Sequence, residues 1–197
     1  MSVIISMLIF ALIGAISPGP VNIIASSASA NFGFRQALPH VVGASLCYCL
    51  VVFTAGLALN LTLDVLPALT HLLQYLGAAF LLYMALKIAS APLRLPGQQS
   101  LAKPPSFWQG VLAQGLNPKA WLVAMSGVSL FVAPQQQAEF YLLVFCLISL
   151  MVCLVGVGTW AAIGSLISGY LDSALRLRVF NCSMAVLLAG SVLSLFI

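Results

Sequence analysis

Proline interrupts two apolar stretches of the chain, and the two interruptions lie about half a chain apart. The first is Ser17-Pro18-Gly19-Pro20 and the second is Asn117-Pro118-Lys119. Proline removes a backbone donor and clashes with the carbonyl four residues earlier, which costs ~3 kcal/mol in a straight helix. Serine and asparagine are good N-cap residues, and proline is favoured at the first helical position. We therefore expect a half-helix to end at each break and another to begin, capped by Ser17 and by Asn117.

These breaks could bind an anion. The N-terminus of a helix carries a partial positive charge and free N–H groups. Lys119 adds a full charge about 12 residues into its stretch, roughly 18 Å at the rise of a helix. A lysine at the centre of a bilayer costs at least ~2.5–3.5 kcal/mol, and no apolar stretch holds a carboxylate to pair with it. The carboxylate of a substrate is the partner we expect, with a water-filled vestibule or backbone carbonyls as the alternatives.

The predicted substrate-binding residues lie at or beside the two breaks. Asn22 is predicted either to contact the ligand or to bond to a neighbouring helix, and Trp121 is expected to form a wall of the site. The predicted set is Ser17, Pro18, Gly19, Pro20, Asn22, Gln114, Asn117, Pro118 and Lys119.

Other kinds of site find little support in the sequence. Its two histidines and three acidic residues are widely separated, so we predict no catalytic residue, no metal site and no cofactor. Cys47 and Cys49 form a C-x-C pair, but helical geometry turns their side chains roughly 200° apart. We interpret them as packing residues. The same role is expected for several small residues, which allow helices to approach closely: Gly43, Ala44, Gly77, Gly156, Gly158 and Gly164.

Composition indicates a polytopic membrane protein. Of the 197 residues, 62% are hydrophobic and only 5% are charged, whereas a soluble domain has about 25% charged residues. The net charge of +4 is interpreted as a topology signal, so we predict no nucleic-acid partner. Ala28-Ser29-Ala30 resembles a signal-peptide cleavage site. Because no basic residue precedes the apolar run, we expect this segment to remain as a membrane helix.

The predicted fold is all-α, with six transmembrane helices arranged as two inverted three-helix repeats in one membrane domain. The first repeat is 1–90, the cytoplasmic connecting loop is 91–106 and the second repeat is 107–197. Helices 1 and 4 are expected to be broken near the midplane. The six spans are about Val3–Ala28, Pro39–Leu61, Leu66–Ala89, Phe107–Val132, Glu139–Ile163 and Val179–Ile197.

Loop charges predict the orientation. The first, third and fifth loops hold cations, whereas the second and fourth hold only Asp64 and Glu139. The positive-inside rule places the odd loops in the cytoplasm and both termini outside. Repeats of three helices are then inverted relative to each other. The cations are Arg35; Lys87, Arg94 and Lys103; and Arg176 and Arg178.

At these positions the chain resembles the LysE/RhtB family of amino-acid exporters. The resemblance spans nearly the whole chain and looks closest to the branch that exports cysteine and O-acetylserine. It implies multi-pass export of small neutral or basic amino acids across a bacterial cytoplasmic (inner) membrane, as an antiporter driven by the proton gradient. The matching motifs are Ser17-Pro18-Gly19-Pro20 with Asn22, Gly33-Phe34-Arg35-Gln36-Ala37, Gly43, Phe107-x-x-Gly110 and Asn117-Pro118-Lys119-Ala120.

One position departs from the family pattern. Relatives, as the resemblance suggests, carry an acidic or amide residue one turn before an aromatic residue, where this chain has Val157 before Trp160. Proton coupling would then use His40, His71, loop acids or the ionisation of the substrate. Both histidines are expected to be interfacial filling residues, His40 near the inner mouth.

The preferred hypothesis is a secondary transporter with a small amino-acid substrate, surrounded by membrane lipid and compatible with a homo-oligomer. By rocking one repeat against the other, it would expose its site to each side in turn. Two alternatives are a non-transporting membrane scaffold or assembly partner and an integral-membrane enzyme. A scaffold would have no use for a lysine between matched breaks, and an enzyme would need a cluster of reactive groups that the sequence lacks.

Overall fold

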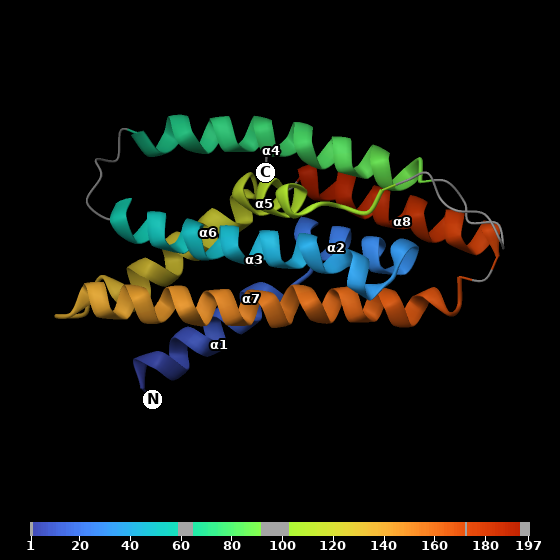
Figure 1. Ribbon diagram of the computed structural model, residues 1–197. Helices are drawn as coiled ribbons and strands as arrows, with labels where there is room; N and C mark the ends of the chain where they lie inside the picture. The colour runs from blue at the N-terminus through green and yellow to red at the C-terminus, as the bar shows by residue number, and fades with distance from the viewer. Residues whose placement is uncertain (1, 59–64, 92–102, 172, 194–197) are drawn as a thin grey trace.

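Helices joined by short connections make up the described part of the protein. The computed structural model describes residues 2–58, 65–91, 103–171 and 173–193, and it has no strand within these ranges (Figure 1). The predicted all-α fold is therefore confirmed there. The helices are α1 (Val3–Ile16), α2 (Pro20–Phe32), α3 (Phe34–Leu57), α4 (Val65–Ala89), α5 (Phe107–Gly115), α6 (Pro118–Gly127), the π-helical turn η2 (Val128–Val132), α7 (Ala138–Ser168) and α8 (Ala174–Leu193).

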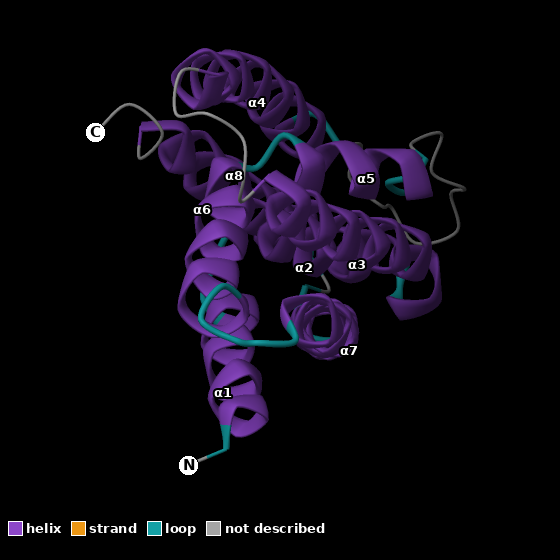
Figure 2. Ribbon diagram, turned by 90° about the vertical axis from the view of Figure 1, so that its left-hand side faces the viewer, coloured by secondary structure: helices purple, strands orange, loops and turns teal. Residues whose placement is uncertain are grey.

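The long helices run lengthwise through the molecule, and the half-helices α1 and α6 slant across them (Figure 1). Figure 2 views α3, α4 and α7 nearly end-on. Helix α3 packs against α5 and α7, α2 packs against α7, and α4 packs against α8. The first broken helix, α1–α2, therefore lies mainly against α7, and the second, α5–α6, lies against α3.

Several helices have the length and composition of membrane spans. Helices α3, α7 and α8 qualify by themselves, with mean hydropathies of 1.8, 2.8 and 1.3. Helices α1 and α2 qualify as one span bent by 57° at the first break. Shorter apolar helices cover Tyr75–Ala89 and Pro118–Val132. Large apolar side chains also point outward, such as Leu50 at 64% exposure, as a lipid-facing surface requires.

The described cations of the predicted loops gather at one end of the bundle, whereas Lys119 lies apart from them at the breaks. Helix α3 begins, α4 ends and α8 begins at that end (Figure 1), and these termini hold Arg35, Lys87 and Arg176. Glu139 is in the first turn of α7, which begins at the opposite end (Figure 1). Arg94, Asp64 and Asp172 lie outside the described residues. The predicted sorting of loop charges is thus seen for the described residues, and the side of the membrane they face stays a prediction.

Several predicted helix ends are wrong. Helix α3 begins at Phe34 rather than near Pro39, which lies inside the helix. The predicted loop between the first two spans, after Ala28 and before Pro39, shrinks to the single residue Gly33. Its φ of 92° is a left-handed backbone conformation that glycine adopts without steric cost. Proline is tolerated near the start of a helix as well as at its first residue, which explains the error. Helix α8 also begins early, at Ala174 instead of Val179, and α7 continues past Ile163 to Ser168.

At the first break, side chains take up the carbonyls that α1 leaves free. The Asn22 amide donates to the oxygens of Ala15 (2.9 Å) and Ser17 (3.0 Å), and the Trp160 indole donates to Ile16 (3.0 Å). In a membrane such groups need partners from the protein. The predicted cap is wrong here: Ser17 ends α1, and Gly19 precedes Pro20 at the start of α2. The helix starts two residues later than proposed because the chain carries a second proline.

The second break forms as predicted. Asn117 is the N-cap of α6, with its Oδ1 accepting from the Lys119 backbone N at 3.2 Å, and Pro118 is the first helical residue. The indole of Trp121 donates to the carbonyl of Gly115 at 2.8 Å. A tryptophan N–H therefore bonds to a carbonyl at the end of the preceding half-helix in both breaks.

Glycines set the closest helix contacts. A Cβ atom at Gly43 would collide with the carbonyl of Phe107, and one at Gly110 with that of His40. The predicted packing role is confirmed by the same test for Gly43, Gly77, Gly156 and Gly164. It is wrong for Gly158, where a Cβ would meet nothing within 4 Å.

We expect Gly164→Ala to destabilise the protein, and Gly158→Ala is its matched control on the same helix. A Cβ at Gly164 would collide with the Ser26 carbonyl of α2, so α2 and α7 must separate, at a cost of roughly 1–3 kcal/mol. Thermal unfolding in detergent measures both variants. Equal melting temperatures for the two would contradict close α2–α7 packing.

We expect Asn22→Leu to destabilise the protein as well. The substitution keeps the size of the side chain but removes the donor to two carbonyls, and an unsatisfied buried polar group costs about 1–3 kcal/mol. The same unfolding measurement, made on Asn22→Gln in parallel, separates loss of the amide from change of shape. A melting temperature unchanged in Asn22→Leu would show that these carbonyls have other partners.

Candidate functional site

Lys119 joins the two breaks. Its ammonium donates to Ser17 Oγ at 2.7 Å and to the Pro18 carbonyl at 3.3 Å. Ser17 Oγ in turn donates to the carbonyl of Gly14 at 2.8 Å. Of the predicted partners of Lys119, a backbone carbonyl is present in this structure, and the Ser17 hydroxyl is a partner that was not predicted.

This link brings four helix ends together. Helices α1 and α5 end at the breaks, and α2 and α6 begin there. From the breaks α2 and α6 run toward opposite ends of the molecule (Figure 1). Helix N-termini attract negative charge and C-termini attract positive charge. The meeting point therefore offers partial charges of both signs to a small ligand.

A cavity lies at this meeting point. Its empty volume is about 440 Å³, a figure that includes open space at its mouth. Six of the nine predicted site residues line it. Those six are Ser17, Gly19, Asn22, Gln114, Asn117 and Lys119; the other lining residues are Gly14, Ala15, Val21, Tyr48, Ala120, Val123, Cys153 and Val157.

The remaining predicted residues shape the breaks without lining the cavity. Pro20 and Pro118 are the first residues of α2 and α6, and Pro18 contributes its carbonyl to Lys119. Trp121 is also absent from the lining, so its prediction as a wall is wrong. Its indole instead bonds to the end of α5.

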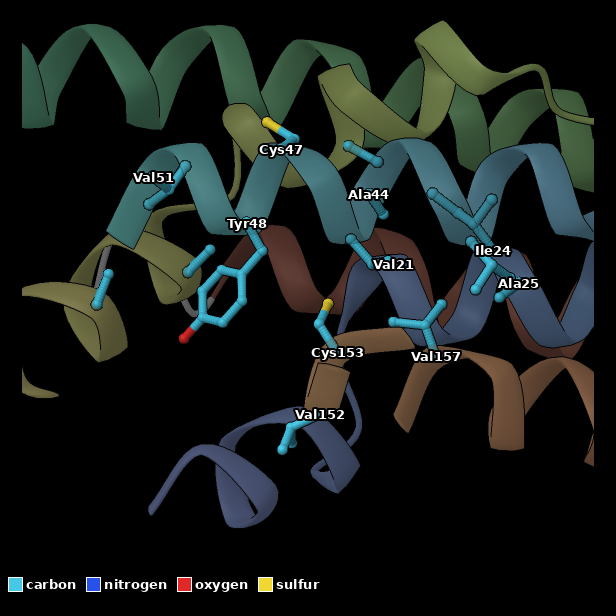
Figure 3. Close-up of a cluster of buried hydrophobic side chains, with 14 of the residues drawn as sticks. Val21, Ile24, Ala25, Ala44, Cys47, Tyr48, Val51, Val152, Cys153 and Val157 are labelled. Atoms are coloured by element: carbon cyan, nitrogen blue, oxygen red, sulfur yellow. The ribbon is translucent and has the colours of Figure 1, made fainter. Parts of the chain in front are cut away.

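The sequence reasoning missed the wall formed by α3 and α7. Tyr48 is 7% exposed, and Figure 3 shows it extending from α3 on the side that faces Cys153 and Val157 of α7. A signal was present, because Tyr48 lies one turn after Ala44 and before Val52 on the apolar face of its helix.

His40 is completely buried on α3, in the second turn after the helix begins at Phe34. Its predicted position at the membrane interface near the inner mouth stays a prediction. Its Nε2 lies 3.3 Å from the carbonyl oxygen of Val21, which itself lines the cavity. The side chain of His71 lies outside the described residues.

The charges of the cavity suit binding rather than bond chemistry. Lys119 is its one formal charge, and no carboxylate lines it. Hydroxyl and amide groups come from Ser17, Asn22, Asn117 and Gln114, whereas the α7 wall of Cys153 and Val157 is apolar. In the ranges that the structure describes, no group of three or more His, Cys, Asp or Glu residues could hold a metal.

Comparisons with known proteins identify the family of the chain. The family profile described as "LysE type translocator" matches residues 12–197. Curated relatives named "Cysteine/O-acetylserine efflux protein" from Escherichia coli (strain K12) and Shigella flexneri serotype 5b (strain 8401) are each 35% identical over 191 residues, covering 95% of this chain and 94% of theirs. A third, from Escherichia coli O139:H28, is 37% identical over 158 residues and 80% of both chains. No solved structure matches the chain significantly. The family profile covers most of the chain, including both breaks, and the chain therefore belongs to the LysE family of translocators.

Proposed function

We propose that this protein is a secondary transporter that exports small amino acids, of the cysteine and O-acetylserine type, from the bacterial cytoplasm. One observation carries the proposal. Lys119 lies in the wall of a cavity where two half-helices begin and is bonded to the other break. The names of the relatives, which are efflux proteins and not enzymes, support the same class of substrate.

A zwitterion fits the cavity electrostatically. Its carboxylate would approach the starts of α2 and α6 and replace Ser17 and Pro18 as a partner of Lys119. Its ammonium would approach the carbonyl ends of α1 and α5. Half-helix ends of both signs serve anionic and cationic groups in this way in broken-helix transporters.

The cavity wall also favours a small side chain without positive charge. Cys153 and Val157 are apolar, and a cationic side chain would find Lys119 but no carboxylate in the lining. Among the neutral and basic amino acids that the family resemblance implies, we therefore favour the neutral ones.

Six membrane crossings complete the proposal. The pairs α1–α2 and α5–α6 each form one broken span, and α3, α4, α7 and α8 form the others. Regions 1–90 and 107–197 act as inverted repeats, joined by 91–106 on the cytoplasmic side, with both termini outside. Rocking of one repeat against the other alternates access to the cavity, and proton antiport supplies the energy.

The two rival functions have less support. A membrane scaffold would gain nothing from a lysine and four helix ends around a cavity. An integral-membrane enzyme would need a nucleophile with a base beside it or an acid pair, and the lining holds no acidic residue or histidine.

We expect Lys119→Met to abolish efflux while leaving membrane insertion intact. Loss of a hydrogen bond from a charged group costs about 1.5–3 kcal/mol, which weakens binding roughly tenfold to more than a hundredfold. Efflux of radiolabelled L-cysteine from loaded proteoliposomes measures the effect. Lys87→Met is the matched control, because Lys87 is not in the lining of this cavity.

Lys119→Arg separates charge from shape. Arginine keeps the positive charge but presents a planar fork, so we expect partial efflux. Normal efflux in Lys119→Met, at wild-type abundance in the membrane, would rule out the carboxylate contact.

A further inference from the structure

His40 holds an unusual position among the polar residues of the core. It is completely buried on α3, with Nε2 at 3.3 Å from the carbonyl oxygen of Val21. Its second ring nitrogen, Nδ1, has no hydrogen-bond partner in the part of the chain that the structure describes. Because a carbonyl oxygen only accepts, Nε2 carries the proton in this arrangement. Nδ1 then carries a basic lone pair that accepts no hydrogen bond from the described residues.

The imidazole connects the start of α2, which lines the cavity, to the contact between α3 and α5. Val21 follows Pro20 in the first turn of α2 and lines the cavity. On the other side, the backbone of His40 is held against α5, where Gly110 leaves no room for a Cβ. The ring therefore bridges the closely packed α3–α5 pair and the start of the half-helix that forms one cavity wall.

No carboxylate stands near this bridge in the packed elements. Helices α2 and α5 and the turn η2 have no ionisable side chain, and α6 has only Lys119. The acid of α7 is Glu139, at the end of the bundle away from the start of α3 (Figure 1). The other ionisable groups are Arg35, Cys47, Tyr48 and Cys49 on α3 itself, and Tyr141, Cys146 and Cys153 on α7.

A proton on Nδ1 would upset this packing. The imidazolium would have a second N–H without an acceptor and a buried charge without a counter-ion. Both are strongly unfavourable in a protein interior. Water or a polar group must reach the ring to stabilise the charged form, so the contact between α3 and the start of α2 must open.

We propose that His40 is the proton-coupling residue of the transporter. Neutral His40 holds the start of α2 in the arrangement described here, and proton uptake at Nδ1 releases it. In each cycle Nδ1 accepts one proton from the external water and later returns it to water on the cytoplasmic side. This inference rests on the proposed export function and adds the residue that would link it to the proton gradient.

The test uses His40→Gln in proteoliposomes. The glutamine amide can still donate to the Val21 carbonyl but has no basic nitrogen. Two assays with radiolabelled L-cysteine under reducing conditions separate transport from coupling: counterflow at equal pH, and the steady gradient built by an imposed difference of one pH unit. At one proton per substrate that difference sustains about a tenfold cysteine gradient, equivalent to ~1.4 kcal/mol.

We expect wild type and the control His71→Gln to build the tenfold gradient. His40→Gln should keep counterflow and lose the gradient. A gradient of wild-type size in His40→Gln would overturn the inference, as would a wild type that exchanges cysteine but builds no gradient. Absence of counterflow in the wild type would instead refute export of this substrate.

A second measurement covers the case in which His40→Gln does not insert. Imidazole NMR of the wild type in nanodiscs follows both histidines, and His71→Gln assigns the signals. Coupling requires the titration midpoint of His40 to move when L-cysteine is added, because linkage between two ligands is reciprocal. A midpoint that cysteine leaves unchanged would overturn the inference.

Discussion

A helix broken inside a membrane leaves carbonyl and amide groups that water cannot reach, and the rest of this structure depends on how the protein satisfies them. Two of the side chains that satisfy them lie just beyond the breaks, and a third comes from a distant helix. Asn22 folds back onto α1, and Trp160 reaches across from α7 to the same helix end. Trp121 does the equivalent for α5. Each of these helix ends therefore has a hydrogen-bond partner from outside its own half-helix.

The same constraint creates the site. Breaking α1–α2 and α5–α6 near each other places two helix beginnings and two helix ends around one cavity. Lys119 spans the gap by bonding to Ser17 and Pro18. These acceptors are uncharged, so the ammonium is held without being neutralised. The Lys119 ammonium thus has hydrogen-bond acceptors when the site is empty, and it would bind an anion more strongly than these acceptors. Such an arrangement suits a site that a carboxylate enters and leaves.

Membership of the LysE family adds a comparison for the α7 wall. Val157 stands where the family resemblance implies an acidic or amide residue, and it lines the cavity together with Cys153. An apolar wall at this place moves the question of proton coupling away from an intramembrane carboxylate, because among the described residues neither the cavity lining nor the helices packed around His40 supply one.

The sequence alone determined the membrane character, the all-helical fold and the positions of both breaks. Each follows from local information: apolar length, proline chemistry and the capping preference of Asn117. Helix ends were less accurate, because proline is tolerated both at the start of a helix, as Pro20 is, and inside it, as Pro39 is. Only the tertiary structure decided that Lys119 bonds to Ser17, that Tyr48 and Cys153 share a cavity with both breaks, and that His40 is buried against Val21. These contacts join separate helices, and the relative rotation of packed helices depends on the complementary shapes of their surfaces, which no local pattern encodes.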